Sequence, residues 1–119
     1  MILRVRPAGP PPGSYEVTFR GVEQTPAGQY GPGLRWLFLI SAGPLAGQTA
    51  SRITGVSPTT GNACGKMLRA VAGRTIGLGD EIDLAGLIGR QFLAVVAATD
   101  NGGTRVETVM PLPPPASIE

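Results

Sequence analysis

The segment Ser14-Tyr-Glu-Val-Thr-Phe-Arg-Gly-Val-Glu-Gln24 alternates apolar and polar side chains. Val17 and Phe19 fall on one side of an extended chain, and Thr18 and Arg20 fall on the other. Successive side chains of a β-strand point to opposite faces, so this period of two predicts a half-buried strand. The fold therefore begins with β-structure, and the neighbouring segments can be assigned outward from it.

Four further segments have the length and composition of β-strands, namely residues 34–41, 48–54, 90–98 and 104–110. The segments 34–41 and 90–98 carry apolar residues on both faces. Glycine and proline interrupt strand ladders, so residues 25–33 are expected to form a long exposed loop and residues 42–47 a turn. Residues 99–103 carry a strong hairpin signal because asparagine and glycine tolerate positive φ.

One helix is predicted over residues 58–72, between the third and fourth strands. Thr59 or Thr60 is expected to cap its first free N–H groups, and Gly73 to end it. Its apolar residues occupy one half of the helical wheel and its cations the other, which is typical of a helix that covers a core. A single helical turn is expected within residues 80–89, with Asp83 as its N-cap.

The expected fold class is all-β with one helix, in the order β-β-β-α-β-β. Five short strands with a helix in that place predict a five-stranded barrel of the oligonucleotide-binding (OB) type. The barrel is expected to span residues 14–112, after a proline- and glycine-rich leader (residues 1–13) and before a proline-rich tail (residues 113–119).

Composition limits the chemistry that the chain can perform. It has 119 residues, of which 42% are hydrophobic and 15% charged, which suits one globular domain. No apolar run approaches the roughly 20 residues that span a bilayer, so a cytoplasmic location is expected. There is no histidine and a single cysteine, Cys64, which is expected to be a small core residue. A Ser-His-Asp triad and an ordinary zinc site are therefore excluded, and no enzymatic activity, metal or cofactor is expected.

Two weaker motifs favour structural roles. Residues 61–67 contain Lys66 but lack the glycine spacing and the hydroxyl residue of a phosphate-binding P-loop. Asp80, Glu81 and Asp83 lack a matching set of carboxylates at calcium-loop spacing, so capping and a solvated turn are the favoured interpretation.

Nine of the ten cations are arginine, a residue that suits bidentate contacts with phosphate, although GC-rich coding would give the same bias. The candidate phosphate contacts are the strand arginines and the helix lysine: Arg20, Arg35, Arg52, Lys66 and Arg105. Each of the four arginines is assigned to the polar face of its strand, where an ordinary solubilising charge is the alternative. The candidate stacking residues are Tyr30, in the predicted loop, and Trp36 and Phe38, for which a core position is the alternative.

Two stretches resemble the OB-fold single-stranded DNA-binding proteins of bacteriophages and related mobile elements. They are residues 29–38 (QYGPGLRWLF) and residues 83–96 (DLAGLIGRQFLAVV), the latter followed by TRVETVMPL at 104–112. The resemblance implies cooperative or protective binding of single-stranded DNA in replication or recombination. RNA binding, self-association and contacts with replication or recombination proteins stay open. Many such proteins end in an acidic tail that recruits partners, whereas this chain ends in Pro-Pro-Pro-Ala-Ser-Ile-Glu119.

The alternative function is a protein-interaction or structural module on the same barrel, without nucleic-acid binding. The low aromatic content, the formal net charge of only +2 and the proline-rich ends favour it.

Overall fold

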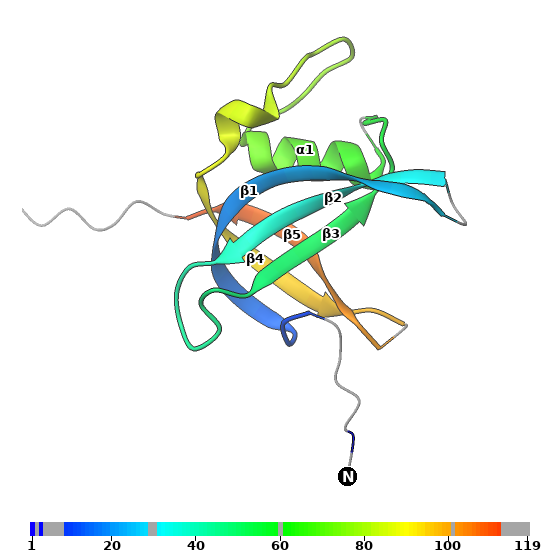
Figure 1. Cartoon of the computed structure of the whole chain (residues 1–119). Helices are drawn as coiled ribbons and strands as arrows, with labels where there is room; N and C mark the ends of the chain where they lie inside the picture. The colour runs from blue at the N-terminus through cyan, green and yellow to red at the C-terminus, as the bar shows by residue number, and fades with distance from the viewer. Residues whose placement is uncertain (2, 4–8, 29–30, 60, 101, 113–119) are drawn as a thin grey trace, which may run out of the picture.

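The computed structural model describes residues 1, 3, 9–28, 31–59, 61–100 and 102–112 (Figure 1). The elements, in chain order, are β1 (Gly13–Gly28), β2 (Gly31–Ile40), β3 (Thr49–Thr54), α1 (Ala63–Ala72), the 3-10 turn η1 (Leu84–Leu87), β4 (Gln91–Ala98) and β5 (Thr104–Pro111). The prediction of five strands with one helix between the third and the fourth is confirmed.

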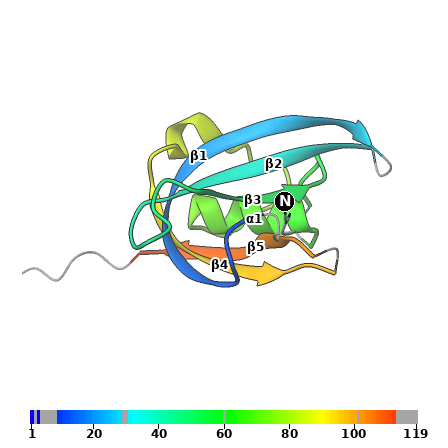
Figure 2. The same cartoon turned by 60° about the horizontal axis from the view of Figure 1, so that its bottom comes forward.

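The five strands form one antiparallel sheet in the order β3-β2-β1-β4-β5. Strand β1 is long enough to pair with β4 through residues 13–18 and with β2 through residues 17–28. A bulge at Arg20 shifts the β1–β2 register, and the next residue, Gly21, has a φ of 109° that side chains rarely adopt. Bulges bend strands, and β1 curves so that β2 and β3 lie over β4 and β5 (Figure 2).

The curved sheet does not close into a barrel, so the predicted five-stranded barrel is wrong in this respect. The sheet ends at β3 on one side and at β5 on the other, and no backbone ladder joins these two edges in the described chain. The Arg52 side chain of β3 instead donates from Nη1 to the carbonyl oxygen of Val106 on β5, at 3.2 Å. This side-chain contact joins the edges of β3 and β5 where a closed barrel would have backbone hydrogen bonds. We call the unpaired junction of β3 and β5 the seam.

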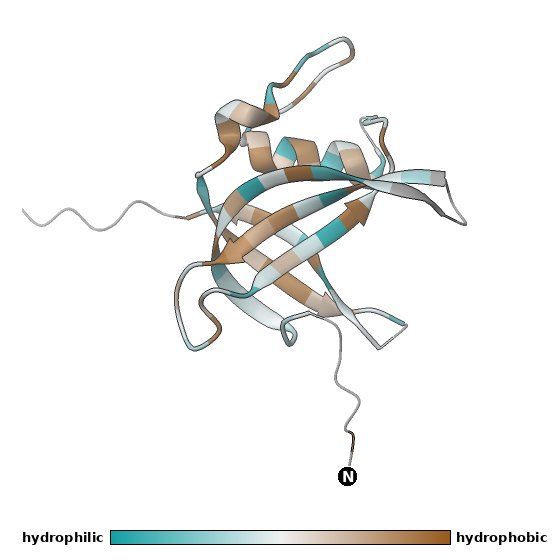
Figure 3. Ribbon diagram, viewed as in Figure 1, coloured by the Kyte–Doolittle hydropathy of each residue, from teal (hydrophilic) through white to brown (hydrophobic). Residues whose placement is uncertain are grey.

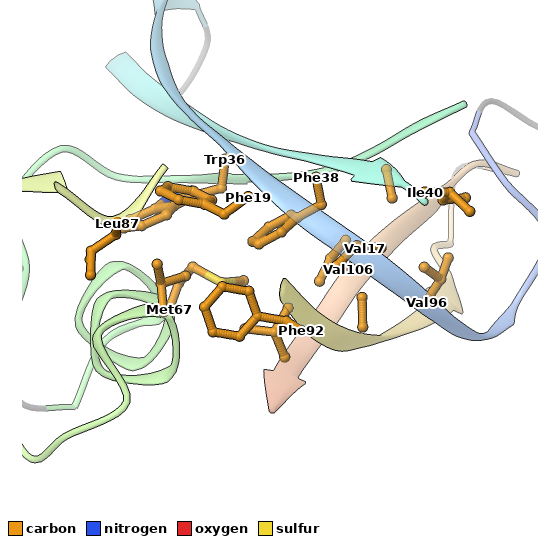
Figure 4. Packing of buried hydrophobic residues seen from close by; sticks show 14 of the residues in the cluster. Val17, Phe19, Trp36, Phe38, Ile40, Met67, Leu87, Phe92, Val96 and Val106 are labelled. Atoms are coloured by element: carbon orange, nitrogen blue, oxygen red, sulfur yellow. The ribbon is translucent and has the colours of Figure 1, made fainter. Parts of the chain in front are cut away.

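The core lies between the two layers of the curved sheet and is closed at one end by α1 (Figures 1 and 2). Phe19 of β1 contacts Trp36 and Phe38 of β2, with ring centroids 6.3 Å and 5.5 Å away. In Figure 4, Met67 of α1 and Phe92 of β4 point toward this aromatic group from the opposite side. Apolar residues are concentrated along the strands and on α1 (Figure 3), as their alternation and helical spacing predict.

The N-cap of helix α1 lies three residues after Thr59, the earliest predicted cap. Asn62 is the N-cap, and its Oδ1 accepts hydrogen bonds from the N–H groups of Gly65, at 2.8 Å, and Thr59, at 3.1 Å. Thr59 therefore precedes the helix, and Thr60 lies outside the described residues. The predicted end is confirmed, since Gly73 is the C-cap in the left-handed conformation. Asp83 caps η1 as predicted, accepting from the N–H of Ala85.

The predicted loop over residues 25–33 is largely a continuation of the β1–β2 hairpin, which pairs as far as Gly28 and Gly31. The loop prediction is wrong because it assumes that the prolines at 26 and 32 end both strands. This part of the hairpin extends beyond the residues that pair with β3 and β4. No third strand pairs with it there, so the N–H group that proline lacks is not needed for a further ladder.

The end of the predicted leader contacts the domain. Thr104 donates from Oγ1 to the carbonyl oxygen of Pro10 at 2.6 Å, and the Tyr15 hydroxyl donates to the carbonyl oxygen of Pro11 at 2.6 Å.

Candidate nucleic-acid interface

Two of the predicted cations, Arg20 and Arg35, belong to β1 and β2. Arg20 is exposed at the bulge of β1 and has no ion pair within the described residues. Arg35 lies opposite Glu23 in the β1–β2 register and forms an ion pair with it, Nη1 to Oε1 at 2.9 Å. Exposed pairs of this kind contribute little stability, so Arg35 stays available to an anion that displaces Glu23.

Arg52 does not lie on the outer face of β3 as predicted. It pairs with Trp36 in the β2–β3 register, and residues directly opposite in an antiparallel pair share a face. Its neighbours on that face, Ala50 and Thr54, are buried. The Arg52 side chain is 15% exposed and reaches the seam, where Val106 accepts its hydrogen bond and Glu107 Oε2 lies 3.8 Å from Nη1. Burial is the main cause that lowers the pKa of Arg52, and Arg105 adds to it.

An open pocket of about 470 Å³ lies at the seam, between α1, β3 and β5. We call it the seam pocket. Three cations line it, Arg52 from β3 and Lys66 and Arg69 from α1. Lys66 and Arg69 are exposed, are three residues apart on the helix and have no ion pair in the described chain. The structure therefore brings together the predicted Arg52 and Lys66, which are 14 residues apart in sequence.

Glu107 of β5 is the acid that lines the seam pocket. Its Oε1 accepts a hydrogen bond from Arg105 Nε at 2.9 Å, which is the main cause that lowers the pKa of Glu107. Arg105, another predicted phosphate contact, does not line the seam pocket. Arg105 holds the carboxylate that faces Arg52, but it lines a separate, smaller pocket near Pro10.

Of the two alternatives for Trp36 and Phe38, the core position is confirmed and stacking on bases is wrong. Trp36 is 1% exposed and Phe38 is fully buried, so neither ring has a face open to a base. Trp36 instead donates from Nε1 to Thr54 Oγ1 at 2.9 Å, inside the core. Both faces of β2 carry apolar residues, and sequence alternation could not decide which face is inside. Tyr30 lies outside the described residues.

Arg69 is a candidate contact that sequence reasoning left out. The signal was available, because Arg69 follows Lys66 by three residues and both were assigned to the polar face of the helix. What the sequence lacked was the position of α1 next to the seam, which places both cations beside Arg52.

The chain matches no known family of proteins, and no curated protein is significantly similar to it. Within the described ranges, no helix has the length and hydropathy needed to cross a bilayer. The same residues contain no group of three or more carboxylates or thiols arranged to hold a metal ion.

Proposed function

We propose that this protein is a non-enzymatic, single-stranded DNA-binding protein with an OB fold. The strand order β3-β2-β1-β4-β5, with a helix between β3 and β4, supports the OB assignment. An OB barrel is partly open, which is compatible with an unpaired seam. Domains of this type bind oligonucleotides, and the stretches that resemble phage single-stranded DNA-binding proteins support that ligand.

The observation that carries the proposal is the convergence of Arg52, Lys66 and Arg69 on one open pocket. Isolated surface cations serve solubility, whereas three cations around a single acid create a local positive potential that attracts phosphate. The cations come from two elements that are far from each other in the sequence, so the grouping is a property of the fold.

The contacts at this pocket favour the phosphate backbone over the bases. Of the aromatic residues that the structure describes, Phe19, Trp36, Phe38 and Phe92 are buried, and Tyr15 is partly exposed. Phosphate contacts carry no base information, so the binding is sequence-tolerant. A stacking contribution is assigned to Tyr30 in the β1–β2 connection, as an expectation from the sequence alone.

A titration of labelled oligo-dT by fluorescence anisotropy tests the proposal. Release of counterions by three phosphate contacts gives a slope of about −2 for the logarithm of affinity against the logarithm of salt concentration. Lys66→Glu and Arg69→Glu should each weaken binding to all sequences alike. Arg90→Glu is the matched control, because Arg90 is an exposed cation that does not line the pocket. Undetectable binding at low ionic strength, or equal loss in the control, would reject the proposal.

A second candidate is a protein-interaction module, supported by the outer face of β2 and β3. Ile53 is 57% exposed there, and Leu37 and Leu39, which alternate with the buried residues of β2, are only half-buried. This candidate predicts a flat oligonucleotide titration together with a protein partner that the Ile53→Glu variant no longer retains.

A further inference from the structure

We propose that the seam pocket binds a phosphomonoester, the doubly charged phosphate found at the end of a nucleic-acid strand or on a free mononucleotide. The strand-end form of this proposal rests on the proposed function. The free-mononucleotide form stands on the geometry of the pocket alone.

The size of the pocket suits a compact group such as a terminal phosphate. Its walls come from α1 on one side and from the edges of β3 and β5 on the other. A volume of about 470 Å³ falls in the range of small-molecule sites, which runs from roughly 300 to 1,000 Å³. Ala63 and Ala70 line it from α1, and their small side chains leave the space beside Lys66 and Arg69 open.

The charge at the pocket matches a phosphomonoester. Arg52, Lys66 and Arg69 face one carboxylate, that of Glu107, so the lining carries a surplus of two positive charges. A phosphomonoester carries about −1.5 to −2 at pH 7, whereas each phosphodiester within a strand carries one negative charge. The surplus is therefore neutralised by a terminal phosphate and only half neutralised by an internal one.

Arg52 is positioned to donate to such a phosphate. Its guanidinium has five N–H donors, and the fold uses one of them for the Val106 carbonyl. Glu107 lies 3.8 Å away, beyond hydrogen-bond distance, because Arg105 holds the same carboxylate at 2.9 Å. Donors of Arg52 thus remain for a ligand, and a planar guanidinium binds phosphate in a bidentate manner.

The remaining lining fits the part of the ligand that carries the phosphate. Met67 and the two alanines give an apolar wall along α1, and Thr108 adds a hydroxyl from β5. An apolar wall beside a cationic group is the arrangement that a sugar phosphate needs, since its carbon skeleton and its charge are adjacent.

The test compares oligo-dT strands of one length that carry a 5′-phosphate, a 3′-phosphate or hydroxyl groups at both ends, at constant ionic strength. Thymidine monophosphate and inorganic phosphate are measured alone and as competitors. We expect a terminal phosphate to raise affinity by about ten-fold, as one additional charge-assisted contact does. The Ala70→Leu variant fills the pocket without changing its charge and should abolish this preference. Ala46→Leu is the control, because Ala46 is exposed in a turn outside the pocket.

The outcomes separate this proposal from the proposed function. Binding of the hydroxyl-ended strand with no gain from a terminal phosphate, and no competition by thymidine monophosphate, overturns the phosphomonoester site and leaves the function standing. Binding of thymidine monophosphate or inorganic phosphate without any strand binding, lost in Ala70→Leu, rejects the function and supports a free phosphomonoester as ligand. No binding of any probe overturns both. If Ala70→Leu melts at a much lower temperature, Ala63→Leu replaces it, since Ala63 also lines the pocket and is exposed.

Discussion

The buried hydrogen bond between Trp36 and Thr54 offers a sharp test of the fold. Trp36 Nε1 donates to Thr54 Oγ1 at 2.9 Å, and the Thr54 hydroxyl donates in turn to the carbonyl oxygen of Gly55 at 2.9 Å. Trp36 is 1% and Thr54 is 6% exposed, so water does not replace a lost partner. The Thr54→Val substitution keeps the shape of the side chain and removes the acceptor.

The expected cost follows from leaving the indole N–H unpaired in the core. An unsatisfied buried donor costs about 1–3 kcal/mol. The Thr54→Val variant should therefore lose about 2 kcal/mol of unfolding free energy, which lowers the melting temperature by roughly 8 °C at about 4 °C per kcal/mol for a domain of this size.

Urea unfolding measured by tryptophan fluorescence gives this number directly, because Trp36 is the single tryptophan of the chain. Thr49→Val is the control: Thr49 is an exposed residue of the same strand, and its replacement should change stability by less than about 0.5 kcal/mol. Equal stability of Thr54→Val and the native protein would refute the assignment of Trp36 to the core. It would reopen the possibility that the indole faces a ligand.

Three further predictions concern other positions. Glu107→Gln removes the acid of the seam pocket and should tighten oligo-dT binding about two- to five-fold at low salt, by relieving repulsion of roughly 0.5–1 kcal/mol. Glu16→Gln is the control, because Glu16 is exposed and does not line the pocket, and weaker binding in Glu107→Gln would contradict this role. Cys64 is buried, and burial raises the pKa of its thiol, so alkylation should require unfolding. Because the pKa of the thiol is higher in the folded protein, the unfolded chain loses this proton first as the pH rises. The free energy of unfolding should therefore be constant below a pH of about 8.5 and fall above it, and no fall there would count against the burial of Cys64. A Cβ at Gly65 would overlap the carbonyl oxygen of Thr59, so Gly65→Ala should cost about 1–3 kcal/mol in urea unfolding, whereas Gly61→Ala meets open space and should cost far less.

The sequence by itself determined the local structure of this protein. Alternation along residues 14–24 and 104–110 identified strands, and helical spacing identified the core face of α1 with Cys64 and Met67. Gly73 and Asp83 were recognised as caps because their roles depend on neighbours within a few residues. These features are short-range. The face of a strand or helix on which a side chain lies follows from its position in the sequence and from backbone geometry alone.

Only the tertiary structure decided which surfaces meet. A period of two divides β2 and β3 into two faces but does not say which is inside when both carry apolar or mixed residues. In the structure, the face that carries Trp36 and Phe38 is inside, and Arg52 shares this face. The approach of β3 to β5 joins residues 52 and 106, and the packing of α1 beside them adds Lys66 and Arg69 to the same pocket. Such contacts depend on how a bulged, curved sheet brings its two edges together, which no local pattern of side chains specifies.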